Sequence, residues 1–450
     1  MGAASNTDSE VPEGCDPNMF HSIGLTLLAC FCTDPELAAD PQMQSKIPIF
    51  NDVITSCKSL RGAELDGGVR GTVDDCYQCL LSIASAPDGQ QQMIRHGSVQ
   101  ALCKACTEKC YGCEKSLPLI IQLLQQNGNQ VWTYYDKVIN QLLDSLSAQF
   151  RETQEKKKFV LCDSLFAVLS TASRPVIETL PYSVWSSNIY YGLSDILRSK
   201  IGAKQRDPAL KLSALMIEHF GISWALGPEQ DSSTKYLLLL VHLSCIEVRI
   251  TLEDTSDCEK ESRSSVISAC YHMLESIIGY MTAEPTLSLT TKQITQLHSA
   301  MVGAFGAVVH YLTRMSEDKS NYTTPLVQAS VRVLGAWLAE ETSALKEDIY
   351  AIIPFLIDIG RESFYELKTR LSKDTAEDLG HTSSTGPLLV DLLRFLLPSL
   401  CHFSAEDVPR NILIENRTHE LLGEYFNYHW LLFTAKNTEY NSEVRVVIVT

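Results

Sequence analysis

The sequence lacks an excess of basic residues. Its 37 Lys and Arg are outnumbered by 54 Asp and Glu, which gives a formal net charge of −17. A nucleic-acid backbone is itself densely negative, so we expect no nucleic-acid partner. The acidic balance is explained either by a solvated surface alone or by recruitment of basic segments from other proteins.

Long apolar runs are also missing. The longest, Tyr236–Ile246, is too short to span a bilayer and contains His242 and Ser244, so we predict a helix buried on most sides. Residues 1–17 are polar and acidic, show no secretory hydrophobic region, and are expected to be disordered. The odd count of 15 cysteines then favours a reduced, cytosolic compartment, with at most peripheral membrane association.

Catalytic motifs are absent from the sequence. No G-x-G-x-x-G, P-loop or G-x-S-x-G pattern occurs, and His419-Glu420 begins a zinc-protease motif in which Gly423 replaces the second histidine. The remaining histidines and acids cannot be paired into a site from sequence alone. We therefore predict a protein that is not an enzyme, with no cofactor and no catalytic residue.

Four cysteines form the pattern C-x2-C-x3-C-x2-C and are the candidate metal ligands: Cys103, Cys106, Cys110 and Cys113. Four thiolates could hold zinc or an iron–sulfur cluster, which would make this chain a metal or redox protein. The same spacing is one face of a helix, and Tyr111-Gly112 should break that helix before the sulfurs converge. We favour buried and loop thiols over a metal site.

The pattern that is present is helical. In Thr324–Gly360, Thr324 and Pro325 open a first helix whose apolar residues recur at helical spacing, and Thr342 or Ser343 can cap a second. Gly335 removes a side chain in mid-helix, which indicates a second helix packed closely there. A lone helical hairpin cannot bury this much apolar surface, so we predict stacked helical repeats.

Two segments resemble the joint between the second and third helices of an armadillo repeat: Met93–Leu102 and Ile412–Leu421. In the first, Gly97 makes the sharp turn, and in the second Asn416 takes the place of the glycine. The sequence thus predicts an all-α, armadillo/HEAT-like solenoid over residues 18–433. A flexible loop at 371–387 and an atypical tail at 434–450 complete the expected organisation.

Two short motifs allow a second interpretation. Leu393–Leu397 matches the L-x-x-L-L helix that docks into receptor grooves, but in a leucine-rich solenoid we expect it to be buried. Lys156–Lys158 is a basic island that we expect to be a solvated helix start, with weak contact to acidic lipid as the alternative.

Six segments form a specific ordered set: Leu27–Cys32 (LLACFC), Asp34–Ala39 (DPELAA), Lys46–Ile49 (KIPI), Asp75–Leu80 (DCYQCL), Pro208–Leu212 (PALKL) and Leu334–Thr342 (LGAWLAEET). In this order they resemble the neurochondrin family, from about residue 18 to about residue 432. The first residues and the closing residues do not resemble the family, which suggests a partial or differently spliced chain.

The resemblance implies a non-catalytic adaptor in neuronal signalling. It implies a part in neurite outgrowth, restraint of calcium/calmodulin-dependent kinase II phosphorylation, and binding of cytoplasmic tails of G-protein-coupled receptors. It also implies a location in dendrites and the postsynapse, with links to endosomal membranes, so a trafficking scaffold is the alternative. The binding face and the oligomeric state stay open.

Overall fold

In the computed structural model the described residues are 17–57, 66–180, 184–228, 233–253, 262–283, 289–377 and 390–435. Within these ranges the chain forms helices joined by turns, without a β-strand, which confirms the all-α prediction. The chain divides into two compact units, Met1–Ile201 with Glu218–Phe220, and Gly202–Ile217 with Gly221–Thr450. Of the segment 1–17 that is predicted to be disordered, residues 1–16 lie outside the described residues, whereas Pro17 is already the first residue of a helix. Residues 378–387 and 436–450 also lie outside the described residues.

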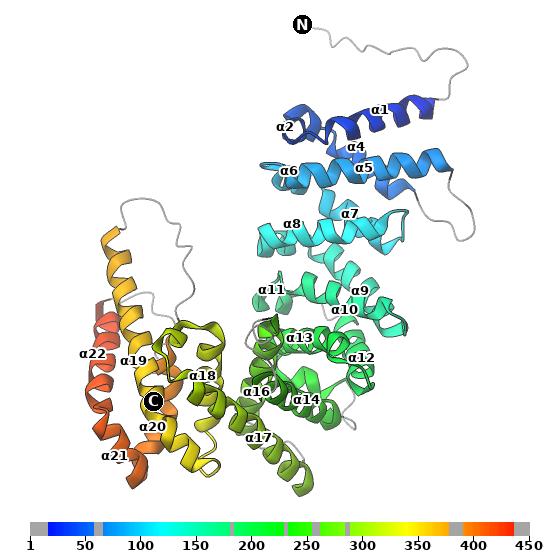
Figure 1. The fold of residues 1–450 in the computed structure, drawn as a ribbon. Helices are drawn as coiled ribbons and strands as arrows, with labels where there is room; N and C mark the ends of the chain where they lie inside the picture. The colour runs from blue at the N-terminus through cyan, green and yellow to red at the C-terminus, as the bar shows by residue number, and fades with distance from the viewer. Residues whose placement is uncertain are drawn as a thin grey trace. The chain divides into compact units, whose positions relative to one another are not determined.

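The first unit is built from two rows of stacked helices (Figure 1). The helices α4, α7, α9 and α12 pack on one another in that order, and α1, α5, α8 and α10 do the same. The elements of this unit are α1 (Pro17–Phe31), α2 (Pro35–Ala38), α3 (Pro41–Gln44), α4 (Ile47–Ser56), α5 (Gly67–Ser85), α6 (Gly89–Arg95), α7 (Ser98–Thr107), α8 (Cys113–Tyr134), α9 (Asp136–Glu152), α10 (Lys157–Leu169), α11 (Arg174–Thr179) and α12 (Trp185–Arg198).

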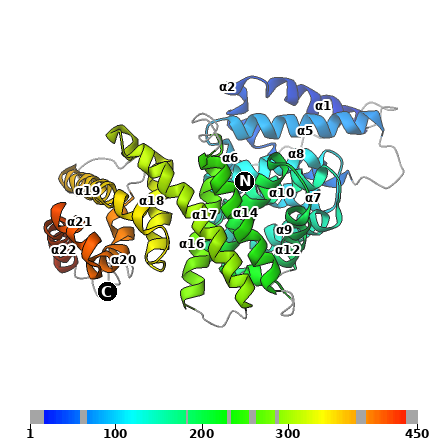
Figure 2. The ribbon, with the colours of Figure 1, turned by 60° about the horizontal axis from the view of Figure 1, so that its bottom comes forward.

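The second unit also consists of stacked helices (Figures 1 and 2). In one row α18 packs between α16 and α20, and in the other α17 packs between α14 and α19. Its elements are η1 (Ile222–Leu226), α14 (Ser233–Glu253), α16 (Ser264–Ala283), α17 (Thr291–Met315), η3 (Lys319–Thr323), α18 (Pro325–Leu338), α19 (Lys346–Glu377), α20 (Leu392–Ala405), α21 (Asp407–Glu415) and α22 (Thr418–Ala435), while α13 (Ala203–Phe220) supplies residues to both units.

Two expected boundaries shift. The helix α19 runs to Glu377, so residues 371–377, which the sequence assigned to a flexible loop, are helical. The helix α22 runs to Ala435, beyond the expected start of the tail at residue 434. In both places helical periodicity weakens before the backbone hydrogen bonding stops, so the apolar pattern underestimates the helix length.

The first armadillo-like joint matches its prediction, and the second is displaced by one residue. Gly97 lies between α6 and α7 with φ 76°, in the left-handed region. At the other end Asn416 has φ −87°, and the left-handed residue is Arg417 with φ 51°. Asn416 therefore corresponds to His96, whose φ is −88°. The sequence predicted the left-handed conformation at Asn416 because Asn tolerates it better than Arg does.

Gly335 allows two backbones to approach closely, as its sequence position predicted. A Cβ built on Gly335 would lie 2.7 Å from the carbonyl oxygen of Phe395 in α20. The hydroxyl of Ser399, one turn further along α20, donates to the carbonyl of Gly335 at 3.4 Å. The helix α20 thus lies directly against the backbone of α18, a packing that a side chain at this position would prevent.

We predict that Gly335→Ala destabilises the protein by about 1–3 kcal/mol, because the new methyl group must push α20 away from α18. The measurement is urea unfolding of the purified chain. Gly279→Ala in α16 is the matched control, since its Cβ would meet no described atom within 4 Å. Replacing glycine by alanine in an open helix should be neutral or stabilising by up to about 1 kcal/mol. Equal losses for both variants would contradict the close-packing argument.

Trp337 anchors the other face of α18. Its indole is 3% exposed and stacks on Phe305 of α17, with ring centroids 4.6 Å apart and planes 7° apart.

We predict that Trp337→Ala costs about 3–5 kcal/mol in the free energy of unfolding. Trp430→Ala, at a tryptophan that is 46% exposed, should cost about 1 kcal/mol or less in the same unfolding assay. Wild-type stability of the Trp337 variant would contradict the prediction.

Candidate functional site

The four candidate metal cysteines are not brought together. Within the described residues, no group of three or more His, Cys, Asp or Glu side chains is placed to hold a metal ion. The helix α7 ends at Thr107, and the left-handed Lys109 and Gly112 turn the chain before α8 begins at Cys113. The helical spacing therefore stops partway through the motif, so the sulfurs do not share one face.

The four thiols differ in their burial and in their contacts. Cys103 is fully buried, Cys110 lies 3.8 Å from the Thr55 carbonyl, and Cys106 donates to the Cys113 carbonyl at 3.5 Å. Burial raises the pKa of the Cys106 thiol to about 12 and also raises the pKa of Cys103 and of Cys113. The geometry of the described residues therefore gives no support to the metal or redox hypothesis built on this cluster.

The segment Leu393–Leu397 packs into the structure, whereas in Lys156–Lys158 two lysines are exposed and only Lys158 is buried. In α20, Leu393 and Leu396 are buried, as predicted for this segment. In the basic island, Lys158 is buried rather than solvated, and its ammonium group lies 3.2 Å from a carboxylate oxygen of Asp195 in α12. The solvated-helix expectation is wrong for Lys158, because the stem of a long side chain can pack in a core while its charge finds a partner.

The second unit contains a hollow of about 220 Å³ at the corner between α18 and α19, next to the corner between α20 and α21. Its apolar lining comes from the buried side chains of Leu338, Ile349 and Phe403. Its polar lining includes Glu341, Lys346, Tyr350, His402 and Glu406. An apolar floor with a few charged groups at the edge is the usual composition of a recognition site.

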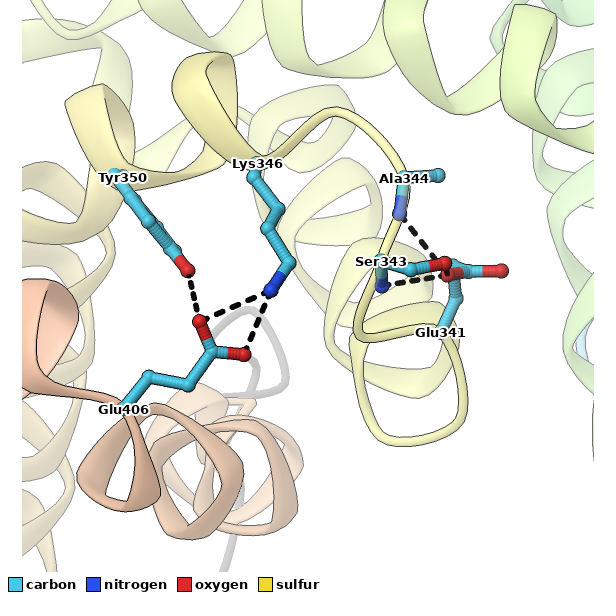
Figure 3. Close-up of polar contacts among 6 residues, drawn as sticks. All are labelled: Glu341, Ser343, Ala344, Lys346, Tyr350 and Glu406. Carbon is cyan, nitrogen blue, oxygen red and sulfur yellow. Dashed lines mark hydrogen bonds and ion pairs between the residues drawn. The ribbon is translucent and has the colours of Figure 1, made fainter.

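Glu341 organises the first corner (Figure 3). Its Oε1 accepts hydrogen bonds from the Ser343 amide at 2.7 Å, the Ser343 hydroxyl at 2.6 Å and the Ala344 amide at 3.0 Å, while His298 of α17 donates to its Oε2 at 2.8 Å. Partial burial opposes ionisation, but these hydrogen bonds outweigh it and lower the pKa of Glu341 to about 2. The corner therefore carries a permanent negative charge.

The caps that the sequence suggested do not form among the described contacts. Thr324 makes no capping hydrogen bond to α18. Ser343 donates to Glu341, and no described contact caps α19 through Thr342 or Ser343. Leu345 takes a left-handed φ of 57° immediately before α19. The Glu341 side chain reaches forward to the amides of the turn, a contact that cap preferences do not rank.

Glu406 joins the two corners (Figure 3). Lys346 at the start of α19 donates to both of its carboxylate oxygens at 2.8 and 3.0 Å, and the Tyr350 hydroxyl donates to Oε2 at 2.6 Å. These hydrogen bonds lower the pKa of Glu406 and raise the pKa of both Lys346 and Tyr350. The pairs are exposed to solvent, so they orient the side chains more than they stabilise the fold.

Two carboxylates, Glu341 and Glu406, line the hollow. Four more exposed carboxylates adjoin the lining residues in sequence: Glu340, Glu347, Asp348 and Asp407. Lys346 and Arg410 are the basic residues of these two corners, and both are paired, with Glu406 and Asp407 respectively. An apolar floor beneath a negative edge suits a partner segment that presents an apolar side chain between basic ones.

We predict that Glu341→Gln destabilises the second unit by about 1–2 kcal/mol at pH 7, because a neutral amide accepts weaker hydrogen bonds than a carboxylate. A folded-state pKa of about 2 lies below the ordinary value of 4.5, so this stabilisation is fully present above pH 5 and is lost as the pH falls towards 2. Urea unfolding at pH 7, 5, 4 and 3 should show the difference between variant and wild type narrowing. Glu340→Gln is the neighbouring control and should show almost no difference.

Comparison with known proteins gives a family match over nearly the whole chain. The model of a family described as Neurochondrin matches residues 6–446, a span that includes most of the terminal residues set apart by the sequence analysis. A chicken protein named Neurochondrin is 39% identical over 433 residues, covering 95% of this chain and 59% of its own length. The human Neurochondrin is 38% identical over 429 residues, covering 95% and 56%.

A more distant relative and a solved structure extend the comparison. A Drosophila melanogaster protein named Neurochondrin homolog is 32% identical over 432 residues, covering 94% of this chain and 57% of its own length. The chain thus spans less than three fifths of the length of these relatives. An engineered protein of known structure aligns over 97% of this chain with a TM-score of 0.46 and 13% identity, a likeness too low to support an argument.

No helix in the described residues combines the length and apolarity needed to cross a membrane.

Proposed function

Since this chain belongs to the neurochondrin family, we propose that it is a non-catalytic adaptor that regulates signalling in neurons. It acts by holding segments of partner proteins on its stacked helices. Its partners are cytoplasmic tails of G-protein-coupled receptors and calcium/calmodulin-dependent kinase II, whose phosphorylation it restrains, and its cellular effect is on neurite outgrowth. It works in the cytoplasm of dendrites and at the postsynapse.

The observation that carries this proposal is the acidic-edged hollow between the α18–α19 and α20–α21 corners. Stacked helices hold its lining residues on rigid elements, which lets a partner bind without first ordering the site. The edge charges do not depend on pH in the physiological range, because Glu341 and Glu406 both have lowered pKa values. Electrostatic complementarity of this kind supports selective, salt-sensitive capture of basic segments.

The test is the binding of synthetic receptor-tail peptides and of the purified kinase to the full chain, by titration calorimetry at 50, 150 and 400 mM salt. We predict saturable binding that weakens as salt rises, because exposed charges are increasingly screened. The double variant Glu340→Gln with Glu347→Gln removes two exposed charges that are next in sequence to the lining residues Glu341 and Lys346, and it leaves Glu341 and Glu406 in place. It should weaken binding about 3–10-fold at 50 mM salt.

The matched control is Glu152→Gln with Glu155→Gln, which neutralises two exposed acids of the first unit. This control removes the same total charge as the test variant but leaves the residues around the hollow unchanged. It should therefore bind like wild type. Equal weakening of both double variants would mean that net charge alone attracts the partners and would contradict a site at the hollow. Absence of saturable binding to every tail and to the kinase would overturn the adaptor proposal.

A further inference from the structure

Two buried thiols face each other between the first helix and the fifth. Cys32 follows the last residue of α1, and Cys79 lies in the middle of α5. The two thiols interact with each other, and each residue is at most 1% exposed. Both are reduced thiols in this structure.

The contact between the two thiols is part of a fixed alignment of α1 along α5. The Ser22 and Thr72 hydroxyls are hydrogen-bonded at 2.9 Å, and the Thr26 hydroxyl donates to the Asp75 carboxylate at 2.6 Å. These two pairs and the Cys32–Cys79 pair follow in the same order along both helices. This register brings the sulfurs of Cys32 and Cys79 together whenever α1 packs on α5.

The two thiols titrate as a coupled pair. Their interaction lowers the pKa of Cys32 despite its burial and raises the pKa of Cys79. Only a thiolate attacks a peroxide or a disulfide, so the thiol that loses its proton reacts first and its partner resolves the oxidised sulfur.

Reagents reach Cys32 through opening of α1. One face of α1 packs on α5, while the opposite face exposes apolar side chains, among them Phe20, Ile23, Leu27 and Phe31, each of which is about half exposed. A helix that is packed on one side only opens at a lower free-energy cost than the helices between two neighbours. Burial of the sulfurs in the docked state thus slows their oxidation without preventing it.

We propose that Cys32 and Cys79 are an oxidative modification site that forms a reversible disulfide when the chain meets a peroxide. The Cys32 thiolate attacks one peroxide oxygen, the O–O bond breaks, and the leaving hydroxide takes a proton to give water and a Cys32 sulfenic acid. The Cys79 sulfur then attacks the Cys32 sulfur, and the sulfenic hydroxyl leaves with the Cys79 proton as a second water. One peroxide is reduced and two thiols are oxidised, and a dithiol reverses the reaction.

The consequence is a covalent connection between α1 and the rest of the first unit. The crosslink would hold the C-terminal end of α1 at the middle of α5, so α1 could no longer separate fully from α5 when it opens and would return more readily. Oxidation thus stabilises the end of the first unit. The hollow of the second unit has none of its lining residues in this region, so the modification acts separately from the proposed binding site.

The experiment treats the full chain with hydrogen peroxide, blocks the remaining thiols with an alkylating reagent, and maps disulfides by mass spectrometry of peptides. We predict a Cys32–Cys79 crosslink that disappears after dithiothreitol. Hydrogen exchange of the α1 amides should slow by about tenfold or more in the oxidised form and return to its original rate on reduction.

Three variants separate this pair from its neighbours. Cys32→Ser and Cys79→Ser should each abolish the crosslink and the change in exchange, whereas Cys30→Ser, at an exposed thiol two positions away, should retain both. A Cys57–Cys76 crosslink in place of Cys32–Cys79, or oxidation that stops at Cys30, would overturn the proposal. A Cys32–Cys79 crosslink with unchanged α1 exchange would overturn its role in holding α1.

Discussion

The close approach of α18 and α20 at Gly335 is the constraint on which the candidate site depends. The Phe395 carbonyl occupies the space that a side chain at Gly335 would need, so the backbones of α18 and α20 can pack directly against each other. This contact fixes where α20 ends, and therefore where Glu406 meets Lys346 and Tyr350. On the opposite side of α18, stacking of Trp337 on Phe305 fixes α17 and with it His298, the partner of Glu341. Both carboxylates at the hollow are thus positioned by the packing of one helix.

Much of this packing could be predicted from the sequence, because it depends on local patterns. Helical spacing of apolar residues predicted the α18–α19 hairpin, and a glycine inside an apolar helix predicted the close neighbour at Gly335. Gly97 likewise indicated its own left-handed turn, since glycine adopts that conformation without a steric cost. In each case one residue and its near neighbours in sequence determine the outcome.

The hollow could not be predicted in the same way, because its polar contacts join distant residues. Lys346 and Glu406 are separated by 60 positions, and His298 and Glu341 by 43, so no spacing rule connects them. The second armadillo-like joint was misplaced for a different reason. Tertiary packing there holds Arg417 in a conformation that its intrinsic preference disfavours, and such strain persists only where the surroundings impose it. Lys158 was misjudged because its partner, Asp195, lies in another helix.

The same stacking that builds the hollow explains why the two ends of the described chain differ from its middle. A helix within a row buries both flanks, whereas α1 and α22 each leave apolar side chains exposed, such as Leu27 in α1 and Trp430 in α22. Nearest-neighbour stacking makes such end helices the least stable part of a repeat array. A crosslink at Cys32 would therefore act on a helix that leaves an apolar face exposed within the described residues. The hollow, by contrast, is lined by residues of the second unit only, and none of them belongs to α1.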